Sequence, residues 1–144
     1  MATEAIPHAD LTYRIIGCAM KVHTELGPGL REIHYHRALS QAFEDAGLSF
    51  DDEKSILIEF EGQRVGRICV DHLVEDRVLV EEKALAHLLT GDEIGQVITY
   101  LAATGLPVGL LLNFGRRSLQ YKRILRPRKL NDWQQRIGRY ARSA

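Results

Sequence analysis

An unbroken apolar run, Val108-Gly-Leu-Leu-Leu-Asn113, constrains the fold of this chain more than any other feature. The run is short, holds no charged residue and follows a helical pattern that ends at Gly105. At this length, after Gly-Leu-Pro, it is typical of a central strand that is buried on both faces. A strand of that kind after a helix favours an α/β sandwich, with the sheet in the middle.

Two helices are expected before the first strand. Asp10 can cap a helix over residues 11–26, in which apolar residues recur with the 3.6-residue period. The sequence Gly27-Pro28-Gly29 ends this helix, because glycine permits a left-handed exit and proline cannot continue the hydrogen-bond ladder. A second helix is predicted over residues 31–46, with Gly47 in the position expected after its C-cap.

The period then changes from 3.6 to 2, which predicts strands. Residues 55–60 and 64–70 are expected to pair across a turn at Glu61-Gly62, and residues 77–81 form a third strand. Thr90-Gly-Asp-Glu93 matches a capping box for a helix that runs to Thr104. Later residues predict an edge strand at 119–124 and a weakly apolar helix at 130–142. A helix between two strands implies a right-handed crossover, and therefore one mixed sheet in one domain spanning residues 1–144.

The composition is that of a globular protein. The chain has 144 residues, of which 45% are hydrophobic and 26% charged, enough for one core and too few for two ordinary domains. No stretch approaches the roughly 20 apolar residues that span a bilayer, so no membrane partner is expected. The first residues lack a basic region and an apolar signal core, so we expect a cytoplasmic protein. Cys18 and Cys69 are then expected to be reduced and buried.

The zero net charge conceals an asymmetry. Residues 1–115 carry 9 Lys and Arg against 18 Asp and Glu, whereas residues 116–144 carry 10 against 1. A basic C-terminal segment on an acidic body is typical of a protein that binds a phosphate backbone. The same pattern fits a segment that folds back onto its own acidic domain, or onto that of a second subunit. Charge alone favours neither interpretation.

The segment Val80-Glu81-Glu82-Lys83 is the strongest candidate for chemistry. Side chains alternate along a strand, so Glu81 and Lys83 share a face about 6.6 Å apart. Asp71 ends the preceding strand, and a short antiparallel connection can bring its carboxylate beside Glu81. Two carboxylates with a lysine between them form an oxygen-rich pocket for Mg²⁺ or Mn²⁺. The alternative is a set of solvated strand ends or a surface ion pair.

Several further motifs occur in order along the chain. They are Ile15-Ile16-Gly17, Val22-His23, Leu26-Gly-Pro-Gly-Leu30, Gly29-x-x-Glu32-x-x-Tyr35, Asp71-His-Leu-Val-Glu-Asp, Gln96-x-x-x-Tyr100 and Thr104-Gly-Leu-x-Val-Gly-Leu-Leu-x-Asn-Phe114. Together with Val80-Glu-x-Lys83, this set resembles the GxxExxY protein family. That family is assigned by similarity to the PD-(D/E)XK nuclease superfamily, and the resemblance spans residues 11–124. It implies a restriction-endonuclease-like α/β/α core with a central mixed sheet.

The resemblance also implies roles for individual residues. Asp71, Glu81 and Lys83 would be the catalytic triplet, and Glu32 would add a carboxylate near the metal. Gln96 and Tyr100 fit the Gln-x-x-x-Tyr element of RecB-type nucleases and share one helix face at i and i+4. The alternative for this pair is an ordinary half-buried helix face.

Two residues depart from the family pattern: Val70 precedes Asp71 where a smaller residue is common, which is minor, and the second is Glu82. Glu82 stands where an apolar residue is more usual, and its side chain should point to the opposite sheet face from Glu81. A buried charge there needs a partner. Either that face is wet, or Glu82 pairs with a basic group such as one from the C-terminal segment.

The histidines give weaker signals. His34 and His36 lie about 200° apart on a helix and cannot chelate one metal together. His72 should alternate away from Asp71, and His23 is expected to be structural.

Two functions follow from these observations. The first is a metal-dependent nuclease that acts on DNA or on RNA, with DNA the more expected substrate and Mg²⁺ or Mn²⁺ as cofactor. Its basic segment would hold the backbone without reading sequence, through Arg116, Arg117, Lys122, Arg123, Arg126, Arg128 and Lys129. The second is a non-catalytic module of the same fold that binds nucleic acid or oligomerises through that segment. The small size of the chain makes a homodimer reasonable in either case.

Overall fold

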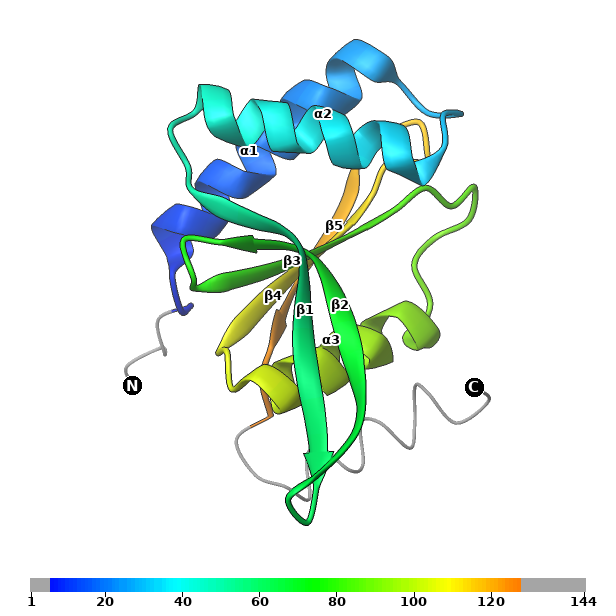
Figure 1. Ribbon diagram of the computed structural model, residues 1–144. Helices are drawn as coiled ribbons and strands as arrows, with labels where there is room; N and C mark the ends of the chain where they lie inside the picture. Colours follow the sequence, from blue (N-terminus) through cyan, green and yellow to red (C-terminus); the bar gives the residue numbers. More distant parts are fainter. Residues whose placement is uncertain (1–5, 128–144) are drawn as a thin grey trace, which may run out of the picture.

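A five-stranded mixed sheet lies between helices on its two faces in the computed structural model, which describes residues 6–127 (Figure 1). The strands follow chain order across the sheet, and only β3 and β4 are parallel. In chain order the elements are α1 (Ala9–Leu26), α2 (Glu32–Asp45), β1 (Phe50–Phe60), β2 (Gln63–Val74), β3 (Val78–Lys83), α3 (Gly91–Thr104), β4 (Val108–Asn113) and β5 (Gln120–Leu125). The predicted α/β class and mixed sheet are confirmed.

The sheet divides the core into two clusters. Val80, Leu110 and Leu112 pack toward α1 and α2, whereas Leu79 and Leu111 pack toward α3. Alternation along the strands produces this division. Every residue of β4 is buried, as its unbroken apolar sequence predicts. Gly109 in β4 lets α3 come close, because a Cβ there would lie 3.0 Å from Val97 Cγ1.

The helix boundaries agree closely with the sequence, with one correction. His8, not Asp10, is the N-cap of α1; Asp10 lies in the first turn, where its charge favours the helix dipole. Gly27 ends α1 with a positive φ of 68°. Thr90 caps α3 in the predicted capping box, and Gly105 ends it in the left-handed conformation.

The β1–β2 hairpin is longer than its sequence pattern predicts. It turns at Glu61 and Gly62 as expected, but β1 already begins at Phe50 and β2 continues to Val74. Only residues 72–74 of β2 also pair with β3, so residues 54–70 form a two-stranded arm that projects from the sheet (Figure 1). The period-2 pattern is weak at both ends of the arm, where charged residues replace apolar ones.

Two further predictions concern the cysteines and the last helix. Cys18 is buried as predicted, but Cys69 is exposed, because it lies on the arm. The helix expected over residues 130–142 lies outside the described residues. Within residues 6–127, no helix is long and apolar enough to cross a membrane.

Candidate functional site

The β2–β3 ladder opens at Asp71 and Glu81. Backbone-to-backbone pairing ends at His72 and Val80. At the next position the strands are joined by hydrogen bonds from backbone N–H groups to side chains. The Asp71 N–H donates to Glu81 Oε1 at 3.0 Å, and the Glu82 N–H donates to Asp71 Oδ2 at 2.8 Å. The two carboxyl groups are therefore fixed beside each other by the strands that carry them.

This carboxyl pair is electrostatically strained in the absence of a cation. Burial, and after it the neighbouring Asp71 charge, raises the pKa of Glu81 to about 9. The pKa of Asp71 is also raised, first by burial and then by the Glu82 charge. Two carboxyl groups that disfavour each other's ionisation hold a proton that a cation can replace. An oxygen-only donor pair of this kind fits Mg²⁺ or Mn²⁺.

Three polar side chains form a row beside the carboxyl pair. Lys83 Nζ donates to Gln96 Oε1 at 3.3 Å, and Gln96 Nε2 donates to the Tyr100 hydroxyl at 3.2 Å. Burial raises the pKa of Tyr100, and the charges of Glu81 and Asp71 raise it further. The structure thus brings Lys83 from β3 and the two α3 residues to one location.

Glu32 lies near this site without joining it. It begins α2, and its pKa is raised by burial, lowered by Lys83 and raised by Asp71. Among the described residues, two groups of at least three ligand side chains have all their ligand atoms within 4.8 Å of one another, and neither includes Glu32, Asp71 or Glu81. The three predicted metal-binding carboxylates are therefore neighbours and not one closed cluster.

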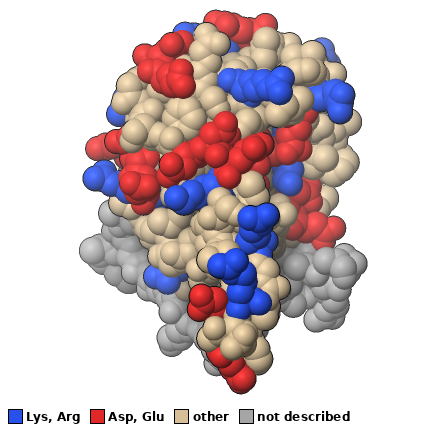
Figure 2. Space-filling view, viewed as in Figure 1, with Lys and Arg blue, Asp and Glu red and all other residues tan. Residues whose placement is uncertain are grey.

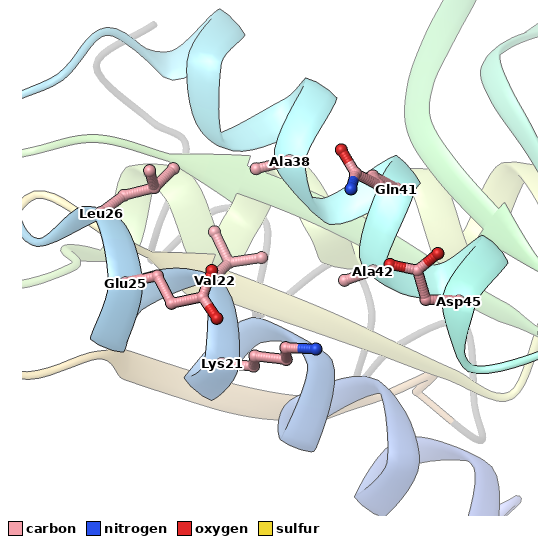
Figure 3. Close-up of a pocket in the computed structure, with 8 residues that line it drawn as sticks. All are labelled: Lys21, Val22, Glu25, Leu26, Ala38, Gln41, Ala42 and Asp45. Atoms are coloured by element: carbon pink, nitrogen blue, oxygen red, sulfur yellow. The ribbon is translucent and has the colours of Figure 1, made fainter.

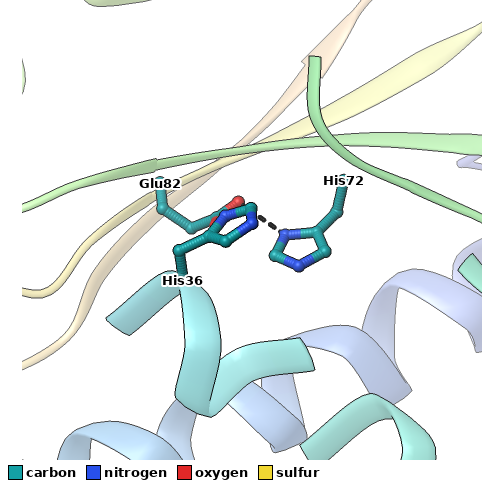
Figure 4. Close-up of side chains that lie close together, drawn as sticks. All are labelled: His36, His72 and Glu82. Atoms are coloured by element: carbon teal, nitrogen blue, oxygen red, sulfur yellow. Dashed lines mark hydrogen bonds and ion pairs between the residues drawn. The ribbon is translucent and has the colours of Figure 1, made fainter. Parts of the chain in front are cut away.

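A second polar cluster lies on the opposite face of the sheet, where Glu82 of β3 and His72 of β2 meet His36 of α2 (Figure 4). His36 Nδ1 lies 2.7 Å from Glu82 Oε1, and His72 Nδ1 lies 3.0 Å from Glu82 Oε2. The two imidazole rings stack with centroids 4.2 Å apart. Glu82 and His72 are fully buried, and His36 is 7% exposed.

The outer ring nitrogens of this histidine cluster also have partners. His36 Nε2 contacts Asp52, and His72 Nε2 lies 2.7 Å from Ser40 Oγ. Because both neighbours of His36 are acceptors, the ring carries two protons, and the hydrogen bond to Glu82 is the main reason that its pKa rises to about 9. The Ser40 hydroxyl can donate to His72 Nε2 or accept from it.

Glu82 therefore has the partners that its burial requires, and they are histidines, not residues of the C-terminal segment. Two histidines satisfy it, and the face is not wet. His36 lies 46 residues away in sequence and His72 lies 10 away, so no local pattern joins them. The expectation that His34 and His36 do not share a metal agrees with their positions, because His34 is exposed at the start of α2.

The predicted basic segment is divided by the fold. Arg123 Nε donates to Thr12 Oγ1 at 3.2 Å on the α1 side, whereas the adjacent Lys122 alternates to the other face. Arg126 follows β5 at the end of the sheet remote from Lys83. Arg116 donates to the Ala86 carbonyl, and its own carbonyl lies 2.7 Å from His23 Nε2, which gives that histidine a structural role. Arg117 is exposed. Arg128 and Lys129 lie outside the described residues.

The charged surface shows a related separation. Figure 2 shows acidic side chains gathered across the middle of one face, with basic side chains on the projecting hairpin below. Lys54, Arg64 and Arg67 belong to that arm. The arm was not among the predicted contact regions, because its charges are mixed with Glu53, Glu59 and Glu61 in sequence.

Asn113 is a structural residue that we did not single out from the sequence. It is fully buried at the end of β4. Its Oδ1 accepts from the Leu85 and Gly115 N–H groups, and its Nδ2 donates to the His87 carbonyl at 3.0 Å. Asn113 thereby fixes the segment that follows Lys83. Its signals in the sequence were a polar residue at the end of an apolar strand and a fixed place in the motif that ends at Phe114.

A cavity of about 250 Å³ lies between α1 and α2 (Figure 3). Its polar lining includes Lys21, Glu25 and Asp45, and none of the predicted site residues contributes to it.

Residues 9–124 match the family described as the PD-(D/E)XK nuclease superfamily. No curated protein sequence matches the chain. A solved structure named SSO0001 superposes with a TM-score of 0.54 and 18% identity, covering 75% of this chain and 54% of that protein. The chain thus spans about half the length of that relative.

A second similar structure is an alkaline exonuclease, LHK-Exo, from Laribacter hongkongensis. It superposes with a TM-score of 0.52 and 15% identity, covering 99% of this chain and 81% of the exonuclease. At these identities both structures show the fold alone.

Proposed function

The chain belongs to the PD-(D/E)XK nuclease superfamily, and on that basis we propose that it is a metal-dependent nuclease that hydrolyses phosphodiester bonds. The observation that carries the proposal is the Asp71–Glu81 pair. Two adjacent strands place both carboxyl groups together where their ladder opens, and the arrangement raises the pKa of both. An ordinary surface ion pair does not bury acidic groups against each other in this way.

Asp71 and Glu81 would hold a Mg²⁺ or Mn²⁺ ion, with Glu32 as a further carboxylate beside them. When bound, the ion supplies charge that polarises the phosphate and lowers the pKa of a water molecule. The protein contributes the alignment. Each carboxyl group has one oxygen tied to a backbone N–H of the neighbouring strand, so neither side chain can rotate freely.

Lys83 would act on the phosphate and on the attacking water. Its ammonium group offsets negative charge on the phosphate and orients the water, or helps to deprotonate it. Gln96 holds Lys83 Nζ at 3.3 Å and is itself held by Tyr100, so the helix fixes the position of the lysine. Gln96 and Tyr100 would also contact the substrate strand.

The substrate would be a nucleic acid, DNA rather than RNA. Arg116, Arg117 and Lys122 are candidates for backbone contacts, and contacts by Arg128 and Lys129 stay predictions. Arg123, on the α1 side, and Arg126, at the sheet end remote from Lys83, would meet the backbone only away from the carboxyl pair. Such contacts weaken as salt increases, because each releases counterions from the backbone. A homodimer stays a prediction, which sedimentation equilibrium tests.

The experiment compares cleavage of plasmid and single-stranded DNA by the purified chain with Mg²⁺, with Mn²⁺ and with EDTA. We expect cleavage that requires the metal and that Asp71→Asn or Glu81→Gln removes. Asp76→Asn is the matched control, because Asp76 is an exposed turn residue that undergoes the same chemical change. The proposal is wrong if the wild type leaves both substrates, and RNA, intact, or if Asp71→Asn cleaves as fast as the control.

A further inference from the structure

We propose that His36, His72 and Glu82 form a second metal site, which takes a transition-metal ion of the Zn²⁺ class. The ligand atoms of these three residues all lie within 4.8 Å of one another, and all three side chains are buried. The site lies on the sheet face that packs against α2, whereas the Asp71–Glu81 pair belongs to the other face. The proposal does not depend on nuclease activity.

The donor types decide which ion would bind. Two imidazole nitrogens and one carboxylate suit Zn²⁺, Co²⁺, Ni²⁺ or Cu²⁺, whereas Mg²⁺ prefers oxygen alone. Both histidines turn the same ring atom, Nδ1, toward Glu82, at 2.7 and 3.0 Å. The two sheet faces would therefore select different metals.

The ring nitrogens that point away from Glu82 are also held by polar groups, as they are in metal-binding histidines. Histidines that bind metal almost always have the second ring nitrogen held by a carboxylate, a carbonyl or another polar group. Here Asp52 holds His36 Nε2, and Ser40 Oγ lies 2.7 Å from His72 Nε2. Both imidazoles are thus oriented with Nδ1 inward before any ion arrives.

The rearrangement on binding is small and balances in protons. Ligand atoms around a tetrahedral ion with bonds of about 2.0–2.1 Å lie about 3.4 Å apart, so the present nitrogen–oxygen distances open by less than about 1 Å. The stacked rings, now inclined at 23°, tilt to aim both nitrogens at one point. His36 releases its Nδ1 proton. His72 moves its proton to Nε2, where the Ser40 hydroxyl changes from donor to acceptor.

A buried site also needs a route of entry, and acidic side chains provide one. Asp52 has 51% of its side chain exposed and contacts His36 directly. His36, Asp52 and exposed Glu53 make up a second group of ligand atoms within 4.8 Å. Because His36 belongs to both groups, an ion captured at the surface meets one continuous line of ligands to Glu82.

The test is a Co²⁺ titration of the metal-free, untagged 144-residue chain, followed by visible absorption and by competition with Zn²⁺. We expect one equivalent of Co²⁺ with ligand-field bands, displaced by Zn²⁺ and retained in excess Mg²⁺. Glu82→Gln, which keeps the shape of the side chain, should weaken Co²⁺ binding at least about tenfold, as should His72→Asn. His87→Asn, Cys69→Ser and Glu81→Gln are the controls, and they should bind Co²⁺ as the wild type does.

Absence of a Co²⁺ spectrum, or a spectrum unchanged in Glu82→Gln, overturns the proposal. If either variant fails to fold by circular dichroism, imidazole ¹⁵N resonances of the wild type decide the question. Zn²⁺ should shift one ring nitrogen of His36 and one of His72. Shifts confined to the other histidines would show adventitious surface binding and would equally overturn the site.

Discussion

The two faces of the sheet at the junction of β2 and β3 both bury carboxyl groups, but they give those groups different partners. Asp71 and His72 are consecutive residues, as are Glu81 and Glu82, yet alternation sends them to opposite sides. On the α2 side, Glu82 is fully buried and each of its oxygens has a histidine partner. On the other side, Asp71 and Glu81 lie beside each other, and each accepts a backbone N–H from the neighbouring strand.

The difference shows how burial acquires a function. The histidine cluster is internally neutralised, because the His36 imidazolium offsets a buried carboxylate. The carboxyl pair holds two acidic groups side by side, and the pKa of both is raised. A bound cation would offset their negative charge. The first arrangement connects α2 to the sheet in the apo protein, whereas the second favours binding.

Breaking the histidine cluster should have the largest effect. His36→Leu leaves Glu82 buried without the imidazolium that offsets its charge, which should lower the free energy of unfolding by about 3 to 5 kcal/mol at pH 7. Urea unfolding in EDTA, followed by circular dichroism, measures the change. The triple variant His36→Leu, His72→Leu, Glu82→Leu should recover most of that loss, because no unpaired charge remains. Equal destabilisation by the single and the triple variant would contradict this account.

Neutralising one member of the carboxyl pair should abolish most of the cleavage without destabilising the fold. Glu81→Gln should slow metal-dependent cleavage at least about 100-fold, which corresponds to roughly 3 kcal/mol of barrier. The same variant should need a higher urea concentration than the wild type to unfold in EDTA at pH 7, because Glu81, with a folded pKa of about 9 against an ordinary 4.5, loses a proton on unfolding and glutamine does not. A variant that loses activity only because it unfolds would not support a metal ligand.

The pH dependence of stability should distinguish the two faces. The folded pKa of His36 is about 9 against 6.5 for an ordinary histidine, so its stabilising contribution is complete below pH 6.5 and is lost as the pH rises toward 9. The raised pKa of Glu81 acts with the same sign, from its ordinary value of 4.5 up to about 9. The metal-free protein should therefore lose stability between pH 6.5 and 9, by a few kcal/mol in urea titrations.

Each face has its own variant in that experiment. Glu81→Gln should remove its part of the slope and leave the part due to His36, and the triple leucine variant should do the opposite. If the metal-free protein became more stable between pH 6.5 and 9, the raised pKa of His36 and that of Glu81 would both be contradicted.

The smallest expected effect concerns the α3 row. Gln96→Ala frees Lys83 Nζ from its hydrogen bond at 3.3 Å without removing a charge. We expect cleavage to slow about tenfold, in the range seen for residues that orient a catalytic group. Thr99→Ala is the control on the same helix, since Thr99 Oγ1 donates only to the Gly95 carbonyl. Equal rates for the two variants would place Gln96 outside the site.

Features that depend on neighbouring residues were predictable from the sequence. The α3 capping box, the exit at Gly105 and the turn at Glu61-Gly62 depend on a few residues each, and the structure has all three. Features that depend on distant residues were not. The length of the hairpin arm, the exposure of Cys69 and the hydrogen bonds of Asn113 depend on which elements pack together, and no short pattern contains that information.

The sequence by itself determined that β4 is buried on both faces and that Glu81 and Lys83 share one side of β3 while Glu82 takes the other. These follow from strand alternation, which is a property of the backbone. Only the tertiary structure decided that the ladder opens at Asp71 and Glu81, and that α2 places His36 over Glu82. A buried carboxyl group must find a partner, but the packing of distant elements determines whether that partner is a histidine, a proton or a metal ion.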